Sequence, residues 1–154
     1  MLPAGYNNNH QIVQAPGYVV IFSEMMHDAR IIPLDLWPHL PANVRQWFGH
    51  SRGRWEGKTF VVETTNFTDK TNFRGSGANM RLTERFTRVD ADTLLYQFTV
   101  DDPESFVRPW SGEIPMKKAP GPIFEYACHE GNYSLVNTLN AARAEEEPDR
   151  ARRK

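Results

Sequence analysis

The stretch that most constrains the fold of this chain runs from Ser51 to Thr65 and reads as a β-hairpin. Two extended segments flank Glu56-Gly57-Lys58, where Gly57 supplies the positive φ angle that a tight hairpin turn requires. From Phe60 to Thr65 nearly every residue is β-branched or aromatic, which favours a pleated strand over a helix. The sequence therefore predicts a sheet organised around this hairpin.

A second predicted hairpin, residues 81–100, has the clearest alternation in the chain. Its period of two is typical of strands with one buried face. The residues that share a face are Leu82, Glu84, Phe86 and Arg88 on the first strand, and Leu94, Tyr96, Phe98 and Val100 on the second. Asp90-Ala91-Asp92 provides the turn between them.

Further short strands are predicted at residues 11–14, 18–24, 30–34, 105–114 and 123–128, with helices at 41–48 and from Ser134 to Pro148. About eight strands with little helix between them predict a mainly β fold. We expect an antiparallel meander that forms a closed or nearly closed lipocalin-like barrel with a C-terminal helix. Strand order stays open, because a Greek key has the same local pattern. Residues 1–148 are expected to form this one domain and residues 149–154 a charged tail.

Composition limits the classes of partner. A chain of 154 residues with 40% hydrophobic and 12% aromatic residues is expected to form one globular domain. A net charge of −1 argues against nucleic acid or an anionic membrane as the partner, and the longest apolar run, Val19 to Phe22, is too short to span a bilayer.

Cys128 is the only cysteine, so it is expected to be a structural thiol. No glycine-rich phosphate loop or dinucleotide fingerprint is present, and no cofactor is expected.

Four short runs stand out as a set: His27 to Arg30, Gly53 to Gly57, Asp101 to Pro103, and Cys128 to Tyr133. Together they resemble a family of uncharacterised exported β-rich proteins of soil bacteria of the Acidobacteria type. The resemblance covers nearly the whole chain, although family members are longer at the N-terminus. It implies export to the periplasm or beyond, and it brings no established reaction. Residues 1–5 lack the charge and apolar core of a signal peptide, so the expectation of export depends on the resemblance alone.

The first candidate site lies in Cys128 to Tyr133, where a strand is predicted to give way to a helix. His129 is the natural proton carrier, because its ordinary pKa lies near neutrality, and Glu130 is its predicted catalytic partner. Asn132 and Tyr133 are predicted to bind a substrate carbonyl or hydroxyl oxygen. The alternative is a strand end with a helix cap, in which His129 faces solvent.

Two further groups supply the remaining candidate residues. At a predicted hairpin tip, His27 is a third catalytic candidate and Arg30 a candidate anchor for an anionic substrate, although Asp28 in such a tip usually bonds the backbone. Around the central hairpin, Arg54 is a second candidate anchor and Trp47 a stacking surface for substrate. Trp55 is expected in the core.

These residues predict a small-molecule-binding barrel, with metal-independent acid–base catalysis of a hydrolase, lyase or isomerase type on a small polar or anionic substrate. A zinc or iron site formed by His27, His50 and His129 with Glu130 is a competing hypothesis, although no paired ligand spacing supports it. Two more hypotheses stay open: a non-catalytic module that binds carbohydrate or protein through exposed tryptophans, and a homo-oligomer that assembles through edge strands.

Overall fold

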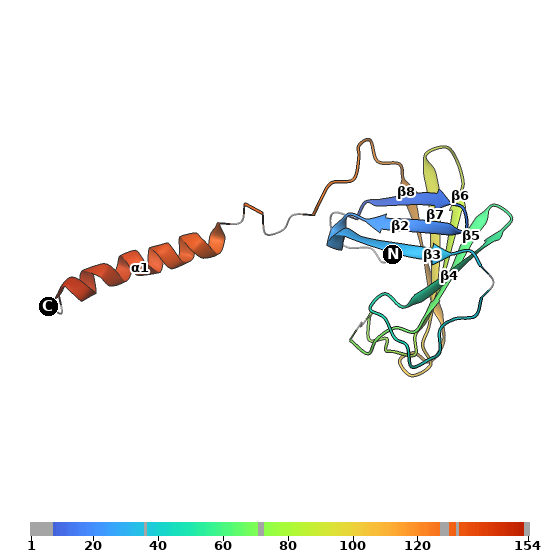
Figure 1. The fold of residues 1–154 in the computed structure, drawn as a ribbon, viewed down its shortest axis with the longest axis horizontal. Helices are drawn as coiled ribbons and strands as arrows, with labels where there is room; N and C mark the ends of the chain where they lie inside the picture. Colours follow the sequence, from blue (N-terminus) through green and yellow to red (C-terminus); the bar gives the residue numbers. More distant parts are fainter. Residues whose placement is uncertain (1–7, 36, 71–72, 127–129, 132, 153–154) are drawn as a thin grey trace. The chain divides into compact units, whose positions relative to one another are not determined.

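Eight strands form two antiparallel sheets in the computed structural model, which describes residues 8–35, 37–70, 73–126, 130–131 and 133–152 (Figure 1). The chain divides into two compact units between Phe124 and Glu125, and each is described by itself. The first unit contains both sheets, and the second contains the helix α1 (Ser134–Arg152). The mainly β prediction with a C-terminal helix is confirmed at this level.

The smaller sheet has the order β1-β2-β3, from β1 (His10–Ala15), β2 (Tyr18–Ser23) and β3 (Asp28–Pro33). Its register sets Ile12 opposite Ile21 and Ile21 opposite Arg30. Residues directly opposite each other share a face of the sheet, so this face contains both apolar side chains and a guanidinium group.

The larger sheet is a five-stranded meander of β4 (His50–Glu56), β5 (Thr59–Thr65), β6 (Arg81–Arg88), β7 (Thr93–Asp101) and β8 (Trp110–Lys117). The two predicted hairpins are its β4–β5 and β6–β7 pairs, and Gly57 has the expected positive φ of 61°. Beyond these pairs, β8 runs to Lys117 and so lies a few residues later in the chain than the predicted strand 105–114.

One hydrophobic core joins the two sheets. Val19, Ile21 and Ile32 of the smaller sheet belong to the same buried cluster as the aromatic residues of the larger one. Across β5, β6 and β7, the directly opposed Phe60, Phe86 and Tyr96 place their rings 6.1 and 5.0 Å apart. Each such aromatic pair contributes about 0.5–1.5 kcal/mol beyond its buried area.

The two sheets are not joined into one by hydrogen bonds between the described strands, so each has its own outer strands. β3 lies near β4 without a hydrogen-bonded ladder between them, while β1 and β8 are the outer strands of their sheets. Within the described residues neither sheet closes on itself. In the part of the first unit that the structure describes, the two sheets are therefore open, and no further strand pairs with the outer edges of β1 and β8.

Four local predictions are wrong. Residues 41–48 form turns and a single parallel bridge between Gln46 and Phe67 instead of a helix, and residues 123–126 are not in a strand. α1 continues past Pro148 to Arg152. Trp55 is 47% exposed, because it lies on the edge strand β4 one residue before the strand ends.

The second unit is described by its helix alone. Leu135, Val136 and Leu139 are exposed on α1. In the part of the chain that the structure describes, no helix has both the length and the apolar character needed to span a membrane.

Candidate functional site

A cleft of about 800 Å³ lies along the unpaired edges of β1 and β8, and we call it the β1–β8 cleft. Its walls come from β1, β7, β8, the β6–β7 turn and the segment that follows β8. The lining residues used below are His10, Ile12 and Gln14 from β1, Leu94 and Tyr96 from β7, Ile114, Met116 and Lys117 from β8, and Arg88, Asp92 and Lys118 beside them.

Strand alternation explains why these side chains face the cleft. Ile12 lies opposite the fully buried Ile21, so every second residue of β1 points to the interior side of its sheet. In the larger sheet, Tyr96 lies opposite Ile114 and Leu94 opposite Met116, so these four side chains share one face. Apolar side chains therefore cover the walls between the two sheet edges.

A buried ion pair lies behind the cleft. Glu84, at 0% exposed, receives two hydrogen bonds from Arg30, one from each terminal guanidinium nitrogen. The hydroxyl of Tyr96 donates a further hydrogen bond of 3.0 Å to Oε1 of Glu84. Tyr96 also lines the cleft, so it connects the cleft wall to the ion pair through its hydroxyl group.

The ion pair determines the protonation states of this region. Burial by itself raises the pKa of Glu84, but the charge and the hydrogen bond of Arg30 hold that pKa well below its usual range. Burial raises the pKa of Tyr96 strongly, and the neighbouring carboxylate of Glu84 acts in the same direction. At neutral pH Glu84 is therefore an anion and Tyr96 a neutral hydrogen-bond donor.

His10 is the histidine that lines the cleft wall. Its Nδ1 atom lies 3.0 Å from Oγ of Ser23 on the neighbouring strand. Burial lowers the pKa of His10 below its usual range, with the charge of Arg30 acting in the same direction and that of Glu84 opposing it. The imidazole is consequently neutral near pH 7 and able to accept a proton.

The rim of the cleft has an excess of positive charge. Lys117 donates to Oγ1 of Thr93 at 2.6 Å, and Arg88 donates to the backbone carbonyls of Asp90 and Ala91. No ion pair within the described residues joins Arg88, Lys117 or Lys118 to a carboxylate. Of the described residues that line the cleft, only Asp92 is acidic.

The structure brings one predicted site residue next to the cleft. Arg30 is a predicted substrate anchor, but its guanidinium group faces Glu84 in the interior. His27 is exposed at the end of the 3₁₀ turn between β2 and β3, where its ring meets that of Phe22 edge-on at 4.9 Å. Asp28 in the same tip accepts a 2.7 Å hydrogen bond from the backbone of Ala29.

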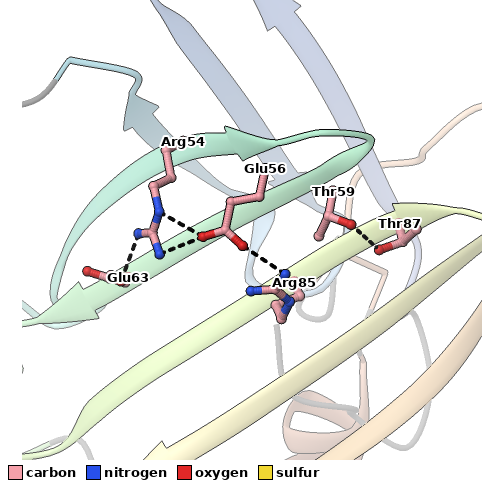
Figure 2. A network of polar contacts seen from close by, with 6 residues as sticks. All are labelled: Arg54, Glu56, Thr59, Glu63, Arg85 and Thr87. Atoms are coloured by element: carbon pink, nitrogen blue, oxygen red, sulfur yellow. Dashed lines mark hydrogen bonds and ion pairs between the residues drawn. The ribbon is translucent and has the colours of Figure 1, made fainter.

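Arg54 lies on the outer face of the larger sheet and not in the cleft (Figure 2). Its guanidinium group forms ion pairs with Glu56 and Glu63, and Glu56 also pairs with Arg85. The hydrogen bonds that Arg54 donates to Glu63 and Glu56 raise the pKa of Arg54, while those that Glu56 accepts from Arg85 and Arg54 lower the pKa of Glu56. All four side chains are well exposed, so each pair contributes little to stability.

The remaining predicted residues lie elsewhere. Trp47 is 58% exposed in the segment before β4. Glu130 and Tyr133 are exposed in the second unit. His129 and Asn132 are outside the described residues, so their predicted roles stay predictions.

The histidines considered for a metal ion are not gathered in the described part of the chain. His50 has another histidine as its neighbour: its Nδ1 atom lies 3.1 Å from Nδ1 of His39. Burial lowers the pKa of both rings, and the charge of Arg52 lowers that of His50 further. Among the residues that the structure describes, no three His, Cys, Asp or Glu side chains are arranged to hold one metal ion.

Sequence reasoning misses His10, Lys117 and Glu84 as site residues. Glu84 has a recognisable signal, since it is an acidic residue with an apolar neighbour on each side, Leu82 and Phe86, along the same face of the strand. A carboxylate on such a face requires a cationic or hydrogen-bonding partner. His10 has no comparable signal, because it stands in a polar N-terminal stretch.

Comparison with known proteins adds no functional information. A scan of family models, a search of curated proteins and a search of solved structures each found no match to this chain. The resemblance to exported soil-bacterial proteins therefore stays a prediction, and function is argued below from the geometry alone.

Proposed function

We propose that this chain binds a small organic anion with an apolar body in the β1–β8 cleft. The observation that supports the proposal most directly is the pairing of apolar walls with a rim on which cationic side chains outnumber carboxylates. Ile12, Leu94 and Met116 offer contact to the apolar body, and Lys117 and Lys118 offer charge to the anionic group. In this proposal the two sheets act together as a nearly closed, lipocalin-like barrel whose opening is the cleft.

The same proposal includes acid–base catalysis, with His10 as the group that carries the proton. Its neutral imidazole lines the cleft, where it can take a proton from a bound ligand. The catalytic roles predicted for His129, Glu130 and His27 stay predictions, as does export from the cytoplasm. Binding itself requires none of these residues, so it is the part of the proposal to test first.

Binding of decanoate, compared with decanol, tests the charge and the apolar contact separately. We expect decanoate to shift the backbone amide resonances of β1 and β8 in a ¹H–¹⁵N NMR titration. Replacing both Lys117 and Lys118 with glutamine is expected to weaken decanoate binding about tenfold, which corresponds to about 1.4 kcal/mol for lost charge-assisted contacts. Decanol binding should be unchanged by this double substitution.

Lys58→Gln is the matched control, since Lys58 is an exposed lysine in the β4–β5 turn and does not line the cleft. Urea unfolding of both variants would show that neither substitution disrupts the fold. Absence of decanoate-induced shifts in β1 and β8 would overturn the proposal. If Lys58→Gln weakened decanoate binding as much as the double substitution, the binding would depend only on the net charge of the protein and not on Lys117 and Lys118.

A second candidate function, carbohydrate or protein binding, is favoured by the exposed aromatic residues before β4. Trp37 is 73% exposed, and Trp47 and Phe48 are also more than half exposed. Exposed aromatic faces suit stacking against sugar rings or a protein surface. In the same NMR experiment, an oligosaccharide ligand would shift the indole N–H signals of Trp37 and Trp47 and leave β1 and β8 unchanged.

A further inference from the structure

A second, smaller pocket of about 400 Å³ is lined almost entirely by aromatic rings. Its walls are Phe73, Phe98, Phe106 and Trp110, with Arg74 at the side. The rings of Phe73 and Trp110 are nearly parallel, with centroids 5.8 Å apart, and Phe106 meets Trp110 edge-on at 6.0 Å. None of these residues lines the β1–β8 cleft, so the two sites are separate.

The indole nitrogen of Trp110 is a buried donor that has no hydrogen-bond partner among the described residues. Buried polar groups in folded proteins are almost always bonded, because an unsatisfied donor loses its hydrogen bonds to water and gains nothing in return. An N–H group in this condition beside an open pocket is suited to a ligand that brings a hydrogen-bond acceptor.

Arg74 supplies a positive charge at the same place. Its guanidinium carbon lies 5.9 Å from the centroid of the Phe73 ring, and within the described residues Arg74 forms no ion pair. Its backbone has a φ of 53°, in the left-handed region that residues with a side chain rarely adopt. Unfavourable backbone conformations of this kind cluster at ligand-binding sites, where the surrounding structure maintains them.

We infer that this pocket binds a planar aromatic carboxylate. The ring of the ligand stacks against Phe73 and Trp110, and the carboxylate receives hydrogen bonds from the guanidinium group of Arg74 and from Nε1 of Trp110. The aromatic ring of the ligand matches the aromatic walls of the pocket. Its carboxylate matches the cation that has no ion pair and the donor that has no acceptor in the described part of the chain. This inference does not depend on the function proposed for the β1–β8 cleft.

Titration with 2-naphthoate, followed by NMR of the four tryptophan indole N–H signals, tests the inference directly. The Trp110 signal is expected to move downfield as its N–H gains an acceptor, while the signals of Trp37, Trp47 and Trp55 stay in place. A Kd of about 0.1–1 mM is expected for a ligand of this size. The neutral analogue 2-naphthamide should bind at least about tenfold more weakly, because it brings no charge for Arg74.

Two variants separate the charge from the donor. Arg74→Gln is expected to weaken naphthoate binding about tenfold and to leave naphthamide binding unchanged. Trp110→Phe keeps an aromatic wall but removes the donor, so naphthoate binding should fall in a protein that urea unfolding shows to be folded. Arg81→Gln, which removes an exposed arginine outside the pocket, is the control.

Several results would overturn the inference. An unmoved Trp110 signal at saturating naphthoate would place the ligand elsewhere. Equal affinity for naphthoate and naphthamide, or full affinity in Arg74→Gln, would remove the role of charge. Full naphthoate affinity in Trp110→Phe would show that the indole N–H does not bond to the ligand.

Discussion

Replacing Glu84 with glutamine is expected to lower the free energy of unfolding by about 3 kcal/mol, because removal of one partner of a buried ion pair leaves the other charge uncompensated. Glu84 is fully buried and Arg30 is 18% exposed, so the guanidinium group cannot recover its hydration without movement of the strands. The amide of glutamine would also direct N–H groups toward a guanidinium group that only donates. Urea unfolding at pH 7 measures the loss.

The matched control is Glu63→Gln. Glu63 accepts a 2.7 Å hydrogen bond from Arg54 on the exposed outer face of the sheet (Figure 2), where ion pairs contribute about 0–1 kcal/mol. A triple variant with Arg30→Met, Glu84→Leu and Tyr96→Phe should recover most of the stability, because it replaces the buried pair by apolar groups of similar size and leaves no Tyr96 hydroxyl without an acceptor. If Glu84→Gln cost no more than Glu63→Gln, the interior pair would not be a buried ion pair in solution.

The same pair gives a dependence on pH with a definite sign. The pKa of Glu84 is lowered in the folded protein, so its contribution to stability is fully present above the unfolded value of about 4.3. That contribution is lost as the pH falls through the folded pKa. The stability difference between wild type and Glu84→Gln should therefore be largest at neutral pH and decrease at strongly acidic pH.

The local pattern of the sequence predicts the hairpins but not how the sheets meet. The hairpin predictions use only residues that are close in sequence: the alternation in residues 81–100 and the turn residue Gly57. The structure confirms both hairpins. Arg30 and Glu84 are 54 positions apart in sequence, so no local pattern connects them. The β1–β8 cleft is formed by the first and last strands of the first unit, so its residues share no local pattern that would group them.

The wrong helix at residues 41–48 has a specific physical cause. The side-chain amide of Asn66 donates to the carbonyls of Leu40, Pro41 and Val44, at 3.1, 2.9 and 2.9 Å. In a helix these carbonyls would accept from backbone N–H groups four residues later. Here the Asn66 side chain bonds to all three, and the Pro41 carbonyl also accepts from the backbone N–H of Val44, three residues later, as in a turn. The periodicity of apolar residues therefore does not decide the structure.

Replacing Gly49 with alanine is expected to destabilise the fold by about 3 kcal/mol, from backbone strain of about 1–2 kcal/mol and crowding of similar size. Gly49 has a φ of 68°, and an added Cβ atom would lie 2.6 Å from the carbonyl oxygen of Thr65 and 2.7 Å from Cγ2 of Thr64. Neither atom can move aside easily. Thr64 is buried and its hydroxyl is bonded to that of Ser51 at 2.9 Å, while the Thr65 carbonyl belongs to the main chain of β5.

Gly57→Ala separates the two contributions. Gly57 has a similar φ of 61°, but an added Cβ atom would meet nothing within 4 Å, so only the strain of about 1–2 kcal/mol is expected. Urea unfolding of the two variants should therefore differ by about 1–2 kcal/mol, the part due to crowding. Equal losses would mean that the segment before β4 can shift away from Thr64 at little cost. The bridge between Gln46 and Phe67 would then be a weak attachment, and the exposed Trp47 beside it would not be held in a fixed position.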